Sequence, residues 1–291
     1  MVSIAFCHSF WPQIIGVLRS VKARLAPLSP TIMSSSSEPV NITVDTLPAS
    51  RIKRKPTFKS PFVYTPSSDG TDTNLLILLH GLGDTPAGFG RLGASLNLPQ
   101  TATLAIAGPE SIPYLLPDEQ GFQWHKSFDD LGEIIEHPDP RPAVKFLKDT
   151  ILKHLTVDCG WKEDEIHLFG FAQGGSVAGE LALALAQETP ARRLASIVSV
   201  CGPLYSFPTP STPCGTPVLV FNRIAGDRTR SKVESDVRSW RKGFGRVVHE
   251  VVQGGAPVSM LANKDEWGRV MAFWADVLQK RMPDGVYAVR K

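Results

Sequence analysis

The segment that most constrains the fold runs from residue 165 to 185 and reads EIHLFGFAQGGSVAGELALAL. Its apolar run at 166–169 predicts a short buried strand, and the small apolar residues at 176–187 predict a helix. The glycines between them let the backbone turn sharply and let the helix approach the strand closely. A buried strand joined directly to a helix is the repeating unit of α/β sheets, so this segment favours that class of fold.

The same alternation continues through most of the chain. Strands are predicted at 75–79, 101–107, 166–169, 194–200, 217–221 and 246–252, and helices at 86–97, 143–156, 176–187, 232–242 and 265–280. This order predicts a mostly parallel, twisted sheet with right-handed connections and helices on both faces. Because no repeat of 20–50 residues is visible, we expect a single domain over residues 61–291.

The charge of the chain argues against nucleic acid as a partner. The sequence has 31 Lys and Arg residues against 28 Asp and Glu, a formal net charge of +3. Residues 1–37 contain Arg19, Lys22 and Arg24 and no acid, so the whole surplus lies there and the rest of the chain is formally neutral. Proteins that bind nucleic acid usually carry a concentrated basic surface instead.

Residues 1–60 are expected to form a leader and linker that is largely disordered or amphipathic. Apolar residues recur at helical spacing among the bases of residues 1–37, as in a mitochondrial transit peptide or a segment that lies on a membrane surface. Alternatively this stretch is inert and Met33 is the true start. The basic run at 51–59 resembles a nuclear address, although a solvated approach to the first strand is the simpler interpretation.

The cysteines predict no metal site. Cys7, Cys159, Cys201 and Cys214 form no CxxC pair and no ordered spacing with histidines. Such sparse use of cysteine suits a reducing compartment, and no apolar run is long enough for a transmembrane helix. We therefore expect a cytoplasmic protein, or a mitochondrial one if residues 1–37 act as a transit peptide.

The turn at residues 170–174 has the form of a nucleophile elbow without its nucleophile. Gly170-Phe171-Ala172-Gln173-Gly174 lies between strand and helix, the context in which a GxSxG motif operates. The central residue of that motif stands at the helix N-terminus, where backbone N–H groups stabilise developing negative charge. Here it is Ala172, and a methyl group cannot attack a carbonyl.

A second motif, LLILLHGLGD at 75–84, is typical of the loop that supplies the other oxyanion N–H in an α/β-hydrolase. With it, the chain resembles the acyl-protein thioesterase/carboxylesterase (phospholipase/carboxylesterase) family of α/β-hydrolases. HGLGDTPAGF, NLPQTATLAIAGP, GFAQGG and EWGRVMAFWADVL carry the resemblance, which covers residues 62 to 281. It implies an α/β-hydrolase fold and a cofactor-free serine hydrolase acting on fatty-acyl thioesters or esters, such as S-palmitoylated proteins and lysophospholipids.

The resemblance also assigns roles to individual residues. The oxyanion donors would be the backbone N–H groups of Leu82 and Gln173, and the acid would be Asp227. The base position in the loop after strand 246–252 falls at Val258, and the nucleophile position at Ala172. Because two of the three triad members are absent, the chain is expected to be a catalytically impaired relative, a pseudoenzyme.

Other residues are candidates to replace the missing nucleophile and base. Ser176, Cys201 and His125 are the alternatives for a relocated nucleophile or base, although a packing serine and a buried structural cysteine are the simpler interpretations. His249 is expected to be a satisfied strand histidine and His80 an architectural hydrogen-bonding residue.

The long connection at 108–140 is too long for a simple loop and is therefore a candidate functional loop. Its apolar residues either line an acyl-binding groove or cover the core: Leu115, Leu116, Phe122, Trp124 and Phe128. Three functions thus remain open from sequence alone: an impaired hydrolase, an active hydrolase with relocated groups, and an acyl-binding or protein-interaction module. A fatty-acyl ester, thioester or acylated protein is the expected ligand, and the oligomeric state is left open.

Overall fold

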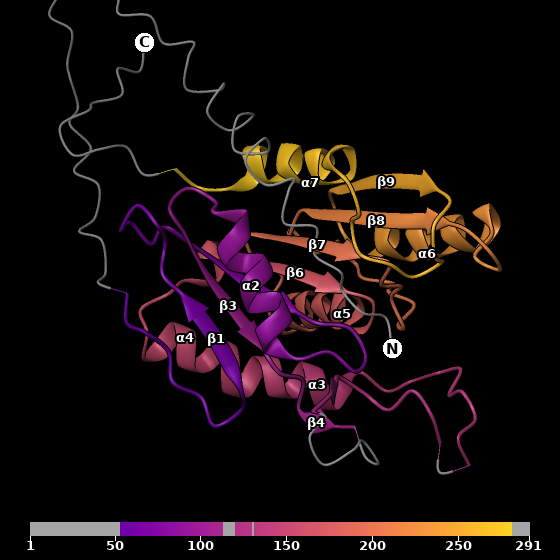
Figure 1. Cartoon of the computed structure of the whole chain (residues 1–291), viewed down its shortest axis with the longest axis horizontal. Helices are drawn as coiled ribbons and strands as arrows, with labels where there is room; N and C mark the ends of the chain where they lie inside the picture. Colours follow the sequence, from indigo (N-terminus) through magenta and orange to yellow (C-terminus); the bar gives the residue numbers. More distant parts are fainter. Residues whose placement is uncertain (1–52, 113–119, 130, 281–291) are drawn as a thin grey trace, which may run out of the picture.

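The computed structural model describes residues 53–112, 120–129 and 131–280. Predictions about residues 1–37, Leu115 and Leu116 lie outside these ranges. A seven-stranded sheet runs through the molecule in the order β1-β3-β2-β6-β7-β8-β9 (Figure 1). Its strands are β1 (Phe62–Thr65), β2 (Asn74–Leu79), β3 (Thr101–Ile106), β6 (Ile166–Phe171), β7 (Ser196–Val200), β8 (Val218–Ile224) and β9 (Val247–Gln253). All neighbouring strands are parallel except β1, which runs antiparallel to β3.

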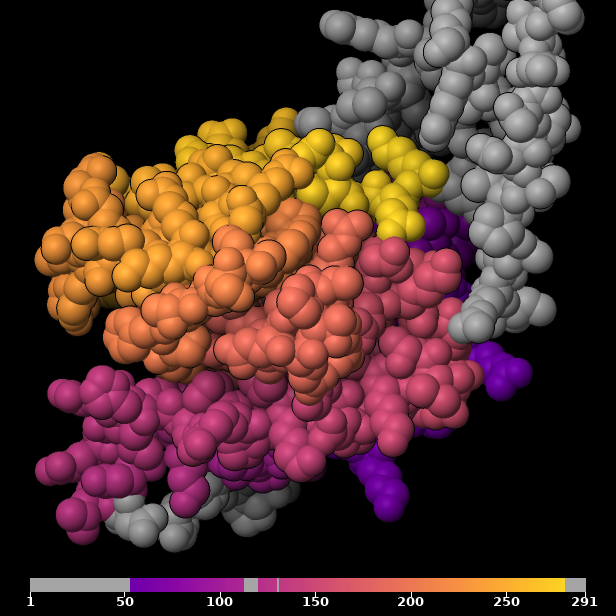
Figure 2. All heavy atoms as spheres, turned by 180° about the vertical axis from the view of Figure 1, so that it is seen from behind, coloured from indigo at the N-terminus to yellow at the C-terminus, as the bar shows by residue number. Residues whose placement is uncertain are grey.

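Helices cover both faces of the sheet, as the alternation predicted. On one face α2 (Pro86–Leu96) and α7 (Lys264–Val277) pack against side chains of β2, β6, β7 and β8. The other face is covered by α3 (Arg141–Phe146), α4 (Lys153–Val157), α5 (Gln173–Glu188) and α6 (Arg230–Gly243). Figure 2, the opposite view, shows the C-terminal elements along the upper side of the molecule and the residues before α5 along its lower side.

The central strands are apolar because both of their faces are covered. Every residue of β2, β3, β6 and β7 is buried, which explains why their sequences are mostly apolar. β9 differs, because it is an edge strand and most of its residues are half-buried. The centre of the sheet is therefore inaccessible to solvent, and the glycine turn at 170–174 lies at the end of one of its central strands.

The structure corrects several predicted boundaries. α5 begins at Gln173 rather than at 176, β8 continues to Ile224, and the helix predicted at 143–156 contains a π-helical segment, Leu147–Leu152, between α3 and α4. Strand β1 was not predicted at all, because it is short and half-buried and leaves no clear period in the sequence. A two-stranded ribbon of β4 (Glu110–Ser111) and β5 (Phe122–Gln123) lies within the long loop.

Residues 53–60 contact the domain, although the sequence placed them in the linker. The Lys53 ammonium forms an ion pair with Glu165 and lies 4.4 Å from the centre of the Trp161 ring. Pro56 is buried, and Phe58 packs edge-on against Phe62. These contacts place the start of the packed chain before residue 61. Among the described residues, no helix is long and apolar enough to cross a membrane.

Candidate active site

Ala172 occupies the sharp turn between β6 and α5. Its backbone has a φ of 48° and a ψ of −114°, a conformation that costs a residue with a Cβ about 1–3 kcal/mol. The Ala172 N–H donates to the carbonyl of Val200 at 2.9 Å, and the Ala172 carbonyl accepts from the N–H of Ser176 at 3.1 Å. The strained turn of a nucleophile elbow is therefore present, with a methyl group where the hydroxyl would stand.

The loop after β2 lies directly against this turn. A Cβ added to Gly81 would lie 2.8 Å from the Phe171 ring, and one added to Gly174 would overlap the carbonyl oxygens of Leu79 and His80. Only glycine permits these approaches. The HGLGD loop and the elbow therefore pack directly against each other.

His80 has an architectural role in this loop. Its Nε2 accepts from the Gly108 N–H at 2.9 Å, and its Nδ1 lies 2.6 Å from the Gly81 carbonyl, so Nδ1 carries the proton. Complete burial lowers the pKa of His80 to about 4. A neutral imidazole with both nitrogens engaged is an anchor for the loop rather than a proton shuttle.

Leu82 and Gln173, the two predicted oxyanion donors, lie in the HGLGD loop and at the start of α5. Gln173 is the first residue of α5, so its N–H has no acceptor within the helix and lies at the positive end of the helix dipole. The Leu82 side chain is 41% exposed, in the loop that contacts the elbow. Their joint role as oxyanion donors remains a prediction.

The side chain of Gln173 holds the long loop against α5. Its Oε1 accepts from the Trp124 N–H at 3.0 Å, and its Nε2 donates to the His125 carbonyl at 3.1 Å and to the Ser127 hydroxyl at 2.7 Å. Trp124 is fully buried and its indole N–H donates to the His80 carbonyl, so it covers the core. Phe122 is half-buried and Phe128 is 50% exposed. An acyl-binding role of this loop remains a prediction.

The acid and base positions lie on neighbouring loops. Asp227 is exposed in the tight turn that follows β8, where Ala225 bridges Arg228. A Cβ on Gly226 in this turn would lie 3.1 Å from the Pro257 ring, so the turn touches the loop that carries Val258. Val258 is 40% exposed. The two loops therefore contact each other, and the assignment of Asp227 as the acid and of Val258 as the base position remains a prediction.

A buried ion pair that the sequence did not reveal fixes the loop of Val258. The Arg223 guanidinium binds both carboxylate oxygens of Glu266, and each partner is at least 94% buried. Arg223 also donates to the Met260 carbonyl at 2.9 Å, and Glu266 accepts from the Ala262 N–H at 2.8 Å. Arg223 and Glu266 lie on β8 and α7, far apart in the chain, so no local signal pairs them.

Ser176 and His125 are engaged within the fold. Ser176 is fully buried, and its hydroxyl donates to the Ala172 carbonyl at 3.3 Å. The Tyr205 hydroxyl lies beside Ser176 and 2.9 Å from Nε2 of His125. Since Nδ1 of His125 faces the Lys126 carbonyl, Nε2 is the acceptor, and burial lowers the pKa of this imidazole. Tyr205, which sequence reasoning missed, lies between the two alternatives and donates to His125.

Cys201 lies beside the elbow as a buried thiol. It is 2% exposed, and its Sγ donates to the Ser259 carbonyl at 3.8 Å, in the loop of Val258. Burial raises the pKa of this thiol, which leaves it protonated near neutral pH and poorly nucleophilic.

His249 was expected to have its hydrogen bonds satisfied within a strand. Its Nε2 is instead buried without a hydrogen-bond partner among the described residues.

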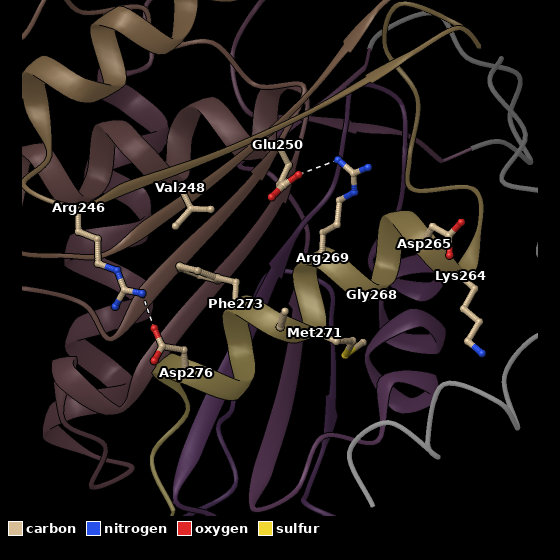
Figure 3. A pocket seen from close by; sticks show the side chains of 11 residues that line it. Arg246, Val248, Glu250, Lys264, Asp265, Gly268, Arg269, Met271, Phe273 and Asp276 are labelled. Atoms are coloured by element: carbon tan, nitrogen blue, oxygen red, sulfur yellow. Dashed lines mark hydrogen bonds and ion pairs between the residues drawn. The ribbon is translucent and has the colours of Figure 1, made fainter. Parts of the chain in front are cut away.

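A groove of about 600 Å³ lies away from these residues, between β9 and α7 (Figure 3). β7 and β8 separate it from the elbow. No group of three or more His, Cys, Asp or Glu side chains suited to a metal ion occurs within the described ranges.

Comparisons with known proteins agree with this geometry. The family model described as phospholipase/carboxylesterase matches residues 61–223. An uncharacterised hydrolase of Mycosarcoma maydis is 36% identical over 77% of this chain and 83% of its own length. Two solved structures share the fold. Esterase PE8 has a TM-score of 0.59 and 21% identity, and the match covers 75% of this chain and 98% of the esterase chain. Acyl-protein thioesterase 2 of Zea mays has a TM-score of 0.58 and 17% identity, and the match covers 76% of this chain and 100% of the thioesterase chain.

Proposed function

The chain belongs to the phospholipase/carboxylesterase family of α/β-hydrolases, and on that basis we propose that it has lost the family's serine hydrolysis while keeping the site that received the acyl group. The proposal covers fatty-acyl esters and thioesters as ligands, in line with the thioesterase named among the structural neighbours.

The observation that carries the proposal is the conformation of Ala172. The φ of 48° and ψ of −114° give the strained strand-to-helix turn on which a nucleophile stands, and here that turn carries a half-buried side chain without a hydroxyl. The base position, Val258, carries an aliphatic side chain that can neither accept nor donate a proton. An acyl group could be positioned at the elbow, but no acyl-enzyme could form on Ala172.

The surrounding residues support the same conclusion. Ser176 and Cys201 are 0% and 2% exposed, so neither presents an accessible, activated nucleophile. In triads of the subtilisin type, loss of the nucleophile or base costs about 10⁶ in turnover, and about 10³–10⁴ over water remains from the oxyanion hole and binding. We therefore expect turnover far below that of a complete triad.

Turnover of an acyl thioester and of a p-nitrophenyl ester tests the proposal. The full chain should show at most the residual turnover that remains without a triad, about 10⁶-fold below that of a complete one, and Ser176→Ala and Cys201→Ala should leave that rate unchanged. Turnover that either substitution abolishes would instead identify a relocated nucleophile and overturn the proposal.

Repair of the triad tests whether the site itself is retained. Ala172→Ser with Val258→His should create esterase activity, and adding Asp227→Asn should remove most of it. The matched control is Ala184→Ser with Val258→His, which adds a serine to α5 at a half-buried position away from the elbow. A folded repaired variant with no more activity than this control would show that Asp227 or Val258 has been assigned wrongly.

A further inference from the structure

The outer backbone edge of β9 pairs with no strand among the described residues, although the outward Val251 carbonyl accepts from Arg269 at 3.5 Å. β9 is the last strand of the sheet and pairs only with β8 among the described residues. The Arg246 carbonyl accepts from the Val218 N–H and the Gly254 N–H donates to the Ile224 carbonyl, so even-numbered residues turn their backbone groups inward. Because these directions alternate along a strand, the N–H and C=O groups of Val247 and His249 point outward. Such an edge can pair with another strand.

The side chains beside this edge form an apolar patch between two ion pairs. Arg246, Val248 and Glu250 project on the α7 face, where Val248 and Phe273 line the groove (Figure 3). Arg246 forms an ion pair with Asp276, and Glu250 accepts from Arg269 at 2.7 Å. One apolar residue thus lies between a positive and a negative residue along the strand.

We propose that this chain forms a twofold-symmetric dimer in which β9 pairs antiparallel with β9 of a second copy, Val248 facing Val248. The twofold axis is perpendicular to the sheet, so the α7 faces of both copies lie on the same side. In this register Arg246 lies opposite Glu250 of the second copy, and Glu250 opposite its Arg246.

The charges select this register over its neighbours. Residues directly opposite each other in an antiparallel pair project to the same face, so even-numbered residues of one copy must face even-numbered residues of the other. Centring the pair on Glu250 brings two carboxylates together, and centring it on Arg246 brings two guanidinium groups together. Shifts that place Val248 opposite Arg246 or Glu250 leave charges without an opposite partner across the axis. Only the Val248-centred register pairs both charges.

The backbone groups fit the same register. When Val248 faces itself, Val247 lies opposite His249 of the second copy, and both residues point their N–H and C=O groups outward. They therefore form the hydrogen-bonded pairs, and Val248 forms a non-hydrogen-bonded pair, in which side chains lie closer. Each side of the axis then carries a line of alternating charge, from Asp276 and Arg246 of one copy to Glu250 and Arg269 of the other. The proposal does not depend on the proposed function, because none of these residues belongs to the elbow.

Complementary charge reversals test the dimer. The full chain should have about twice the mass of one chain by light scattering. Arg246→Glu opposes two carboxylates at each contact, and Glu250→Arg opposes two guanidinium groups, so each variant alone should dissociate about tenfold or more readily. Mixed in equal amounts, the two variants should form a heterodimer, because every contact then joins opposite charges. Thermal unfolding of each variant verifies that it is folded.

A disulfide reports the register directly. Directly opposed residues of a non-hydrogen-bonded pair have Cα atoms about 4.5 Å apart, within the disulfide range of about 4.4–6.8 Å. Oxidised Val248→Cys should therefore form an interchain disulfide, and the matched variant Glu250→Cys should not, both in a Cys7→Ser background. Cys159, Cys201 and Cys214 are buried and do not interfere. A monomeric full chain without the disulfide, or a dimer unaffected by either charge reversal, would overturn the proposal.

Discussion

Removal of the Glu266 carboxylate should destabilise the protein strongly. Glu266→Leu leaves the buried Arg223 guanidinium without its counter-charge and deprives the Ala262 N–H of its acceptor. Loss of one partner from a buried ion pair typically costs about 3–5 kcal/mol. For a domain of this size, a loss of 1 kcal/mol lowers the melting temperature by about 2–4 °C, so we expect a decrease of about 6–20 °C.

A double-mutant cycle tests the reasoning behind that magnitude. Arg223→Met removes the other charge, and Arg223→Met with Glu266→Leu removes both, so the double variant should lose less than the sum of the single losses by about 1 kcal/mol or more. The control is Asp149→Asn, which breaks an exposed pair with Lys145 and should cost less than about 1 kcal/mol. Urea denaturation at pH 7 measures all four variants. The interpretation fails if Glu266→Leu costs no more than the control, or if the two single losses simply add.

Three further predictions concern the elbow and its supports. Ala172→Gly should raise the unfolding free energy by about 1 kcal/mol. Glycine relieves about 1–3 kcal/mol of backbone strain, and this exceeds its entropic cost of about 0.5–1 kcal/mol. A lower melting temperature of the variant would contradict this. Burial lowers the pKa of His80 and His167 to about 4 from 6.5. The unfolded chain therefore binds more protons than the folded chain between these pH values. The free energy of unfolding should fall as pH decreases from about 6.5 to 4, by up to about 1.4 kcal/mol per pH unit for each histidine. His167→Gln should reduce the slope of unfolding free energy against pH, measured by denaturation at several pH values. Gln173→Ala should leave the buried backbone N–H of Trp124 without its acceptor and lower the unfolding free energy by about 1–3 kcal/mol. Amide hydrogen exchange at Trp124 should increase, and unchanged exchange would contradict the prediction.

The sequence specified most of the sheet because its central strands are buried on both faces. Continuous apolar runs such as 75–79 have no other place in a fold of this class, and the structure confirms them as strands. β1 escaped prediction because a four-residue, half-buried edge strand has no such signal. The start of α5 was placed late because glycines at 174 and 175 disfavour a helix, and their close contact with β2 and β7 outweighs that tendency.

The candidate site was predictable only where it is local in sequence. The glycine turn and the HGLGD loop are contiguous motifs, so their residues could be named, and the structure brings them into contact. The strain at Ala172 is a property of the folded backbone and has no sequence signal beyond the flanking glycines. The Arg223–Glu266 pair and the contacts of Tyr205 with Ser176 and His125 join distant segments, so only the structure could reveal them.

The most direct test of the lost chemistry is covalent labelling of the full chain by a fluorophosphonate, followed by intact-mass measurement and peptide mapping. The probe reacts with serines activated by a general base, so the repaired variant Ala172→Ser with Val258→His should be labelled at position 172 and verifies the assay. We expect no stoichiometric labelling of the natural chain, since Ala172 and Val258 supply neither nucleophile nor base. Stoichiometric labelling of the natural chain at any serine would contradict the account.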